Sequence, residues 1–385
     1  MATSTAGSEL DQAPPVVRVG LLTRLHLDLP LLIALLLLSG YGLLVLFSAT
    51  DQDLAKLESQ LLRLGIAFGV MIGFAQVPPT QLRRWAPLVY LAGVIMLVGV
   101  LVAGDVGKGA QRWLDLGVLR FQPSELLKVA LPLMLAWFLA ERALPPSPLR
   151  TFLAVLLTGI PVGLIAVQPD LGTALLVASA GAFVLFLAGL SWRLIASLGL
   201  LGIALTPVLW HFMRDYQRQR VLTLLNPESD PLGAGYHIIQ SQIAIGSGGV
   251  YGKGWSNGTQ SHLEFLPERS TDFIFAVLGE EMGLLGILVL LSVYLFIIAR
   301  GLYIASRARD NFARLLEGGL TLVLFVYLFV NTVIVRGMLP VVGVPLPLVS
   351  YGGSSMVTIM AGFGMILSIQ THRQLFLARQ SFSSL

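Results

Sequence analysis

The chain has 385 residues, of which 55% are hydrophobic and only 12% are charged. In a soluble protein about a quarter of the residues are charged, so this composition indicates a membrane protein with many spans. The net charge of +4 comes from basic residues scattered through short loops, which disfavours a nucleic-acid-binding surface. The chain has no cysteine, which excludes disulfides, thiolate metal sites and cysteine nucleophiles.

The N-terminal region predicts a short tail followed by one large membrane domain. Residues 1–24 are mostly small or polar and include Pro14 and Pro15, which is typical of a disordered cytoplasmic tail. The apolar run from Leu29 to Phe47 exceeds the core of a signal peptide, about 7–15 residues, so we expect a retained first span. We predict a single transmembrane domain over residues 25–375 and a cytoplasmic C-terminal tail over residues 376–385.

Ten apolar windows are long enough to cross a hydrocarbon core of roughly 30 Å. They lie at residues 29–49, 61–77, 85–104, 124–141, 150–168, 171–190, 193–213, 272–299, 313–335 and 350–370. We therefore expect an all-α polytopic fold of about ten transmembrane helices, with tight turns near Pro169 and Ser191. Reading the closely spaced windows at these turns as single long spans gives eight helices, which is the alternative topology.

The charges of the short loops predict how the chain is oriented. The loops on one side are basic and those on the other are more acidic. The basic loops contain Arg18, Arg24, Arg83, Arg84, Arg142, Arg150, Arg193, Arg300 and Arg307, and the acidic loops contain Asp51, Asp53, Glu58, Asp105, Asp115 and Asp170. By the positive-inside rule, both termini are expected in the cytoplasm. The polar segment 214–271, between the seventh and eighth helices, is then one large extracytoplasmic loop, where cytosolic nucleotides are not available.

The extracytoplasmic loop contains a short amphipathic stretch and a run of glycines. Residues 236–245 are too few to span the membrane and suit an interfacial or re-entrant helix. The glycine run resembles a phosphate-binding loop, but Ser247 stands where that motif needs glycine and Gly254 replaces its hydroxyl residue. A nucleotide loop is therefore excluded, which leaves a flexible surface loop or backbone amides that approach an anionic ligand.

Charged residues at the starts of two spans are the first candidates for function. Glu125 follows Pro123 in an ordinary helix-start pattern, but Lys128 lies one turn deeper on the same helix face. A lysine that faces lipid is costly, so we expect Glu125 and Lys128 to pair toward the interior of the bundle. Asp170 repeats this position at the sixth span, where a favourable interaction with the helix dipole is the simpler explanation.

A third candidate, Asp272, lies where the long loop meets the eighth span. Ionisable groups at membrane depth are usually functional. Ser270 or Thr271 would cap the helix and place Asp272 in its first turn, where the helix dipole favours the charged carboxylate. Such a carboxylate suits electrostatic stabilisation or the acceptance of a proton from a hydroxyl group.

Two adjacent glutamates, Glu280 and Glu281, lie about two turns deeper in the same span. They cannot both face lipid, so at least one must be paired with a base or protonated. Lys128 and Arg336 are the candidate partners. These acids inside a span are the feature that most favours a transport function.

A proline-rich segment over residues 338–347 precedes the last span and cannot form a regular helix. Irregular backbone at membrane depth occurs where it is buried in protein or lines a cavity. Ser350, Tyr351 and Gly352 follow directly, and their hydroxyls and amides are candidates for ligand binding.

Five motifs in order give the chain a specific resemblance. They are Gln-Pro-Ser-Glu-x-x-Lys, Gln-Pro-Asp-Leu-Gly-Thr, the glycine-rich loop, Pro-Glu-x-x-Thr-Asp-Phe-Ile-Phe-Ala-Val-x-x-Glu-Glu-x-Gly and Pro-Leu-Pro-x-x-Ser-Tyr-Gly-Gly-Ser-Ser. Together they resemble the SEDS family (shape, elongation, division and sporulation) over essentially everything after residue 20. Gln168, where division-type members usually carry glutamate, and Leu348-Val349 before Ser350 favour the RodA branch over the FtsW branch.

The resemblance implies a bacterial inner-membrane protein that polymerises lipid II into glycan strands outside the cytoplasm during cell elongation. Its implied partners are a class B penicillin-binding protein and other elongation machinery. The family's essential aspartate corresponds to Asp272, and its glutamate and lysine on the fourth span correspond to Glu125 and Lys128.

The expected reaction is attack by the 4-hydroxyl of an acceptor GlcNAc on the anomeric carbon of a donor MurNAc, with Asp272 as general base. Lys128 or the loop cations Arg218, Arg220 and Lys253, with or without a divalent cation, would neutralise the pyrophosphate. No carboxylate cluster or histidine pair has metal-ligand spacing, so we expect no metal site built by the protein.

Other functions fit part of the sequence. A lipid II flippase explains buried charges and broken helices, but it needs charges along a path through the midplane, whereas Asp272, Glu125 and the polar loop cluster at the outer face. A non-catalytic scaffold leaves Asp272 and Lys128 without a role. Within the family, the alternative is an FtsW-type division protein.

Overall fold

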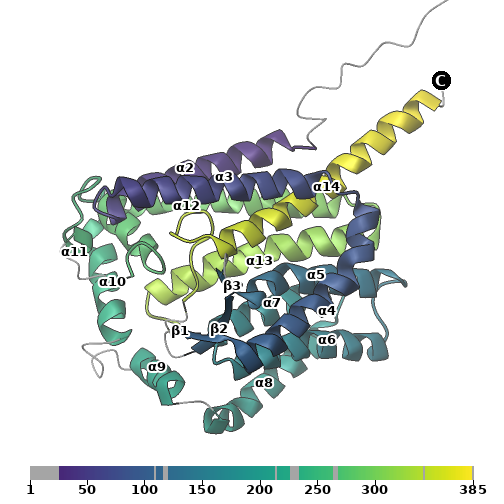
Figure 1. Cartoon of the computed structure of the whole chain (residues 1–385), viewed down its shortest axis with the longest axis horizontal. Helices are drawn as coiled ribbons and strands as arrows, with labels where there is room; N and C mark the ends of the chain where they lie inside the picture. The colour runs from purple at the N-terminus through teal and green to yellow at the C-terminus, as the bar shows by residue number, and fades with distance from the viewer. Residues whose placement is uncertain are drawn as a thin grey trace, which may run out of the picture.

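The computed structural model of the chain describes residues 26–107, 110–115, 120–212, 215–225, 234–262, 268–340 and 343–383. The helices form a bundle in which most long helices run along one axis (Figure 1). They are α2 Leu29–Ala49, α3 Leu54–Ala75, α4 Pro79–Ala103, α5 Pro123–Ala140, α6 Pro148–Val167, α7 Leu171–Leu187, α8 Trp192–Phe212, α9 Asp215–Leu225, α10 Ala234–Gly248, α11 Thr259–His262, α12 Ile274–Ser306, α13 Asn311–Val335 and α14 Ser354–Ser383.

Each of the ten predicted apolar segments is a helix, α2 to α8 and α12 to α14. Eight of the described helices are long and apolar enough to cross a membrane, while α7 and Trp192–Ala204 of α8 are shorter apolar helices. Turns at residues 168–170 and 188–191 separate α6, α7 and α8, so the closely spaced windows form separate helices. The multi-pass helical fold is confirmed, and the number of crossings stays a prediction.

The structure adds one element that the all-α prediction lacks. A small antiparallel sheet of β1 Asp105–Gly107, β2 Ala110–Asp115 and β3 Arg120–Phe121 connects α4 to α5. The segment between α8 and α12 contains α9, α10 and α11, which lie at one end of the bundle (Figure 1). The amphipathic stretch predicted at residues 236–245 is part of α10, which packs against α12.

The centre of the bundle is formed by α5, α13 and α14. In the most apolar part of α5, 78% of residues are buried, and in α13 and α14 72% are buried, against 22% in α3 and α6. Polar groups on α5 and α13 are therefore shielded from lipid and must be paired within the protein. These inner helices carry the charged pair predicted at the fourth span.

Helix α12 is broken at Gly283, whose φ of 63° and ψ of −160° are not helical. The break removes the helical bonds from the amides of Leu284 and Leu285 to the carbonyls two to three residues before Gly283. The turn at residues 249–254 replaces both bonds. Lys253 N and Gly254 N donate to the carbonyls of Glu280 and Glu281 at 3.0 Å, and Leu284 N and Leu285 N donate to the carbonyls of Gly249 and Val250 at 3.0 and 3.1 Å.

The glycines of the loop make this insertion possible. A Cβ atom on Gly252 would collide with the carbonyl of Glu281, and one on Gly283 would collide with the amide of Gly252. On Gly248, a Cβ atom would collide with the carbonyl of Gly279. Over residues 252–254 the glycine run is therefore neither a flexible surface loop nor an anion site. The amide of Gly252 bonds to the carbonyl of Gly248, and those of Lys253 and Gly254 bond to α12.

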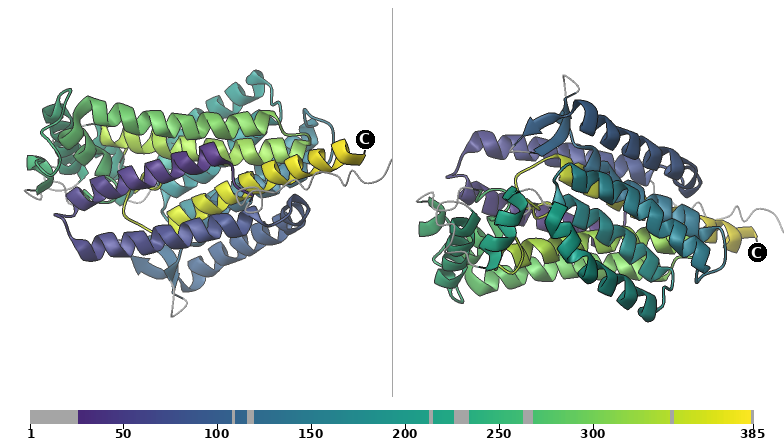
Figure 2. Two further views of the ribbon diagram at one scale, coloured as in Figure 1. Left: turned by 90° about the horizontal axis from the view of Figure 1, so that it is seen from above. Right: turned by 90° about the horizontal axis from the view of Figure 1, so that it is seen from below.

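The opposite end of the bundle is held by Asp28, the N-cap of α2. Its carboxylate accepts bonds from Arg300 of α12 at 2.7 and 3.1 Å and from Gln370 of α14 at 2.9 Å. Burial alone would raise the pKa of Asp28, but these bonds and the amide of Leu31 hold it below its usual value. The start of α2 and the last part of α14 therefore lie at the same end, and both views in Figure 2 show α14 leaving the bundle away from α10 and α11.

Candidate functional site

Glu125 and Lys128 form a buried ion pair in the first turns of α5. Pro123 begins the helix, and the three-residue spacing places both side chains on one face. Lys128 Nζ lies 2.7 Å from Glu125 Oε1 and 2.5 Å from the hydroxyl of Tyr327 on α13. Both charged residues are at most 5% exposed. The predicted pairing toward the bundle interior is confirmed, and Tyr327 is an additional partner.

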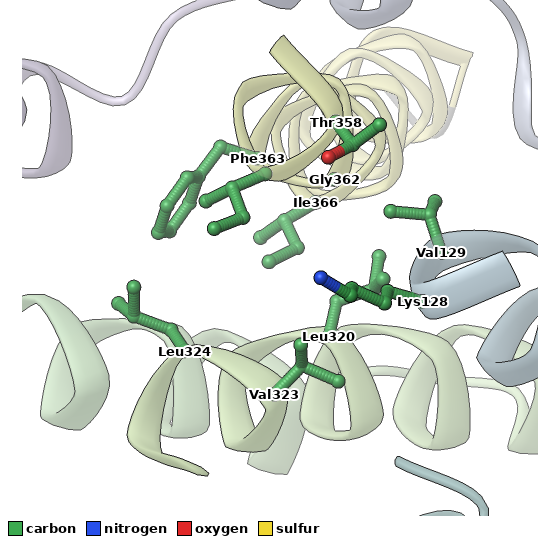
Figure 3. Close-up of a pocket in the computed structure, with 10 residues that line it drawn as sticks. Lys128, Val129, Leu320, Val323, Leu324, Thr358, Gly362, Phe363 and Ile366 are labelled. Carbon is green, nitrogen blue, oxygen red and sulfur yellow. The ribbon is translucent and has the colours of Figure 1, made fainter. Parts of the chain in front are cut away.

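A small cavity adjoins Lys128 where α5, α13 and α14 meet. Its volume of about 20 Å³ is enough for roughly one water molecule. Figure 3 shows the Lys128 side chain reaching into the space between α13 and α14, with Thr358 on α14 across from it. Thr358 Oγ1 lies 3.4 Å from the second oxygen of Glu125. The pair therefore lies beside a small cavity whose walls are mostly apolar.

Asp272 lies directly before α12 and not in its first turn. The helix begins at Ile274 with Phe273 as its N-cap, so the predicted capping by Ser270 or Thr271 is wrong. The side chain of Thr271 bonds instead to Glu268, at 2.9 Å. Since Phe273 is buried at 1% exposure, its packing fixes where the helix starts. Asp272 itself is only partly buried and so remains accessible from the loop.

Helix α13 links Asp272 to the buried pair of α5. The side-chain amide of Asn331 donates to the carbonyls of Asp272 at 3.1 Å and Val344 at 2.8 Å. Tyr327, which holds Lys128, lies four residues earlier and so on the same face, one turn or roughly 6 Å along the helix. The lysine and the aspartate are therefore attached to neighbouring positions of one rigid helix.

The segment Ser350–Gly353 is bonded within the protein. Ser350 Oγ donates to the carbonyl of Thr271 at 2.6 Å and accepts from the amide of Leu346, and Tyr351 N donates to the carbonyl of Ser270 at 2.8 Å. The amide of Gly352 donates to Gln60 Oε1 at 3.3 Å. The Ser350 hydroxyl and the Tyr351 amide therefore hold the chain that leads to Asp272, and the Gly352 amide is bonded to α3. That this segment binds a ligand stays a prediction.

Two residues of α3 that sequence analysis missed support this segment. Gln60 is 1% exposed, and its amide also donates to the carbonyl of Ser350 at 3.2 Å. The guanidinium of Arg63 lies 4.5 Å from the centre of the Tyr351 ring, and among the described residues Arg63 forms no ion pair. A charged residue inside a predicted span was the available signal, because such residues rarely face lipid.

Asp170 lies at the start of α7, where a favourable interaction with the helix dipole was predicted, and it is the N-cap of that helix. Its carboxylate accepts from the amide and hydroxyl of Thr173 at 3.2 and 3.0 Å. It also accepts from Gln122 at 3.3 Å and lies 3.5 Å from Arg112 of β2. Asp170 therefore joins the small sheet and the start of α5 to α7.

Glu280 and Glu281 do not pair with Lys128 or Arg336, so that prediction is wrong. Glu280 Oε1 lies 2.7 Å from Lys253 Nζ and accepts from Thr259 and the amide of Gln260. Glu281 accepts a 2.6 Å bond from Ser48 of α2. Both acids lie next to the break in α12, where the inserted loop brings Lys253 within reach.

The other predicted loop cations are placed differently from one another. Arg218 donates to the carbonyls of Trp210 and His211, at 3.0 and 2.8 Å, near the end of α8. The side chain of Arg220 lies outside the part of the chain that the structure describes. Arg336 is exposed at the end of α13 and contacts neither glutamate.

Within the described ranges, no group of three His, Cys, Asp or Glu residues is arranged to hold a metal ion.

Comparison with known proteins relates this geometry to one family. The model of the FtsW, RodA and SpoVE family, described as a cell cycle protein, matches residues 29–375. The chain is 58% identical over 353 residues to the peptidoglycan glycosyltransferase MrdB of Escherichia coli K12, covering 91% of this chain and 95% of that protein. It is 36% identical over 360 residues to the probable peptidoglycan glycosyltransferase FtsW of Geobacter sp. strain M18, covering 89% and 96%.

Solved structures agree with the sequence matches. The fold is similar to a chain of a peptidoglycan synthase complex, with a TM-score of 0.78 and 34% identity over 90% of this chain and 98% of that chain. It is also similar to the rod shape determining protein RodA of Thermus thermophilus, with a TM-score of 0.68 and 32% identity over 90% and 97%. The family model, the sequence relatives and the fold therefore show that this chain belongs to the FtsW, RodA and SpoVE family, which its motifs predicted.

Proposed function

We propose that this peptidoglycan glycosyltransferase polymerises lipid II at the outer face of the cytoplasmic membrane, with Asp272 as the catalytic base. Similarity to MrdB over nearly the whole chain supports the enzyme class. The observation that carries the site is the shared face of α13, where Tyr327 holds Lys128 and Asn331 holds the main chain of Asp272. The main chain of the proposed proton acceptor and a buried cation are thereby attached one turn apart on the same helix.

The reaction that this arrangement supports needs no nucleotide. The 4-hydroxyl of an acceptor GlcNAc attacks the anomeric carbon of the donor MurNAc, and Asp272 takes the hydroxyl proton. The bond from that carbon to the pyrophosphate breaks, so the configuration inverts and lipid pyrophosphate leaves. Stabilising the charge on the leaving group is the main task that remains for the protein.

We assign that task to Lys128 and Arg63. Lys128 is on the α13 side of the site, and Arg63 faces the Ser350–Gly353 segment from α3. Lys253 stays a candidate for the same task, although Glu280 pairs with it at 2.7 Å, as Glu125 does with Lys128. A divalent cation bound to the substrate's pyrophosphate stays part of the proposal, and chelation by EDTA during polymerisation tests for it.

The orientation and the partner are also proposals. The end of the bundle that carries Asp272 would face outward, as the charges of the short loops predict. A class B penicillin-binding protein with a single span would bind the exposed apolar helices and crosslink the new strands, in keeping with the synthase complex among the similar structures. Copurification of the two proteins from membranes tests this assignment.

A flippase is less well supported by the structure than by the sequence. The acids that favoured transport, Glu280 and Glu281, bond to the inserted loop and to Ser48 beside the break in α12. They are accounted for by the architecture of that helix and do not require a transported substrate.

The test is polymerisation of lipid II by the purified protein. Wild type is compared with Asp272→Ala and with Asp272→Asn, which keeps the size of the side chain but cannot accept a proton. Asp53→Asn is the matched control, because Asp53 caps α3 and asparagine caps equally well. We expect both Asp272 variants to form no glycan chains, and wild type and Asp53→Asn to form them. Equal polymer from all four proteins, or lipid II movement between leaflets without polymer, contradicts the proposal.

A further inference from the structure

A second cavity lies at the end of the bundle opposite to Asp272, where α12 ends and α13 begins. Its volume is about 620 Å³, within the range of about 300–1,000 Å³ that is usual for small-molecule sites. Its polar lining consists of Arg300, Tyr303, Arg307, Arg309, Asp310, Glu317, Gln370 and His372. Arg300 is 26 residues beyond the first residue of α12, roughly 40 Å along the helix, so this cavity is separate from the proposed active site.

The charges around the cavity are balanced. Three arginines line it, but Asp310 and Glu317 line it too, and Asp28 neutralises Arg300. A pocket with only basic residues would suit an anionic lipid headgroup. Equal numbers of guanidinium and carboxylate groups instead suit a ligand that carries both signs of charge.

Three of the lining groups lack partners within the described residues. Arg309 forms no ion pair, and the side chain of Asp310 makes no capping bond although it is the N-cap of α13. The buried oxygen Oε1 of Gln370 has no hydrogen-bond donor. An unbonded buried acceptor is unfavourable by about 1–3 kcal/mol, so a ligand with a donor group is expected here. Together these groups match one phosphate and one ammonium.

A separate apolar groove lies on the outside of the bundle between α2 and α12. Its volume is about 350 Å³, and Pro30, Ile33 and Leu37 face Val293 and Phe296 across it. Phe296 lies one turn before Arg300, and Pro30 follows Asp28, so the groove ends at the ion pair that borders the polar cavity. A polar cavity beside an apolar groove on the outside of the bundle fits a lipid better than a free solute.

We propose that the cavity and the groove together bind one glycerophospholipid whose headgroup carries a phosphate and a primary ammonium. The phosphate lies against Arg309, the ammonium against Asp310 and Gln370, and one acyl chain lies in the groove. The site is independent of the glycosyltransferase reaction and holds a membrane lipid at the seam of α2, α12 and α13.

Native mass spectrometry of the full-length protein in detergent tests this site. Dioleoyl-phosphatidylethanolamine, -phosphatidylglycerol and -phosphatidylcholine are added separately, and soluble glycerophosphoethanolamine supplies the same headgroup without acyl chains. The first lipid is expected to bind most tightly. Arg309→Gln and Asp310→Asn should each weaken it about tenfold, since each removes one hydrogen bond to a charged group. Arg314→Gln, an exposed arginine of the same end that does not line the cavity, should have no effect.

A third variant tests the groove without changing any charge. Ile33→Trp, at a position 47% exposed, should fill the groove and weaken phosphatidylethanolamine binding while the protein unfolds at the wild-type temperature. Equal or tighter binding of phosphatidylglycerol overturns the proposed headgroup. Equal binding of glycerophosphoethanolamine overturns the role of the groove. Binding that the Arg309 and Asp310 variants leave unchanged overturns the site itself.

Discussion

Replacing Lys128 by methionine tests the buried pair of α5. Methionine keeps the apolar stem of lysine but removes the 2.7 Å bond to Glu125 and the 2.5 Å bond to Tyr327. Glu125, at 5% exposure, then carries an unpaired charge whose remaining side-chain hydrogen bond is the one from Thr358 at 3.4 Å. Removing one partner of a buried ion pair lowers the free energy of unfolding by about 3–5 kcal/mol. Lys128→Met should be destabilised by that amount.

The double variant Lys128→Met/Glu125→Gln separates stability from chemistry. It leaves no buried charge, so it should recover most of the stability that Lys128→Met loses. It should still fail to polymerise lipid II. Losing a charge-assisted bond of about 1.5–3 kcal/mol to the leaving group alone slows the reaction roughly 10- to 100-fold.

The two readouts are thermal unfolding in detergent and gel analysis of glycan chains, with wild type and Glu125→Gln measured in parallel. If the double variant recovers stability and also polymerises lipid II at the wild-type rate, Lys128 is a structural residue only. The assignment of Lys128 to the pyrophosphate would then be refuted.

Three further predictions follow from other parts of the structure. The low pKa of Asp28 means that its bond to Arg300 stabilises the protein fully above about pH 4, and that this contribution is lost as the pH falls through the lowered pKa. Melting temperatures measured between about pH 5 and 3 should therefore fall more steeply for wild type than for Asp28→Asn. Asn331→Leu should lower kcat about 100-fold with little change in KM, since it releases the main chain of Asp272, the proposed catalytic base; an unchanged kcat would contradict this. Gly283→Ala should lower the free energy of unfolding by at least about 2 kcal/mol, whereas Gly69→Ala, with open space around its Cβ position, should not.

Features that depend on nearby residues could be predicted from the sequence. The apolar windows predicted all ten long helices because burial in lipid requires continuous apolar segments. The pairing of Glu125 with Lys128 followed from a three-residue spacing on one helix. Capping of α7 by Asp170 likewise needed only the local sequence.

Features that depend on distant parts of the chain could not be predicted from the sequence. The partner of Glu280 is Lys253, 27 residues away in a loop whose docking on α12 no local pattern specifies. The support that Gln60 gives to Ser350 joins residues 290 positions apart. Asp272 was expected in a helix turn, but the packing of Phe273 overrides the capping propensity of Thr271.

The break in α12 has a consequence for the dynamics of the protein. The amides of Leu284 and Leu285 are protected from solvent by carbonyls of the turn 249–254 and not by their own helix. Detaching this turn exposes the helix at its break, and bending the helix there detaches the turn. The loop and the part of α12 before Gly283 should therefore open as one cooperative unit.

Hydrogen exchange should show this coupling directly. The amides of Leu284 and Leu285 should exchange at the same rate as those of Lys253 and Gly254, although 30 residues separate the two groups. Amides deeper in α12, which keep ordinary helical bonds, should exchange more slowly. The loop between α10 and α11 and the membrane helix α12 would then share a single opening event.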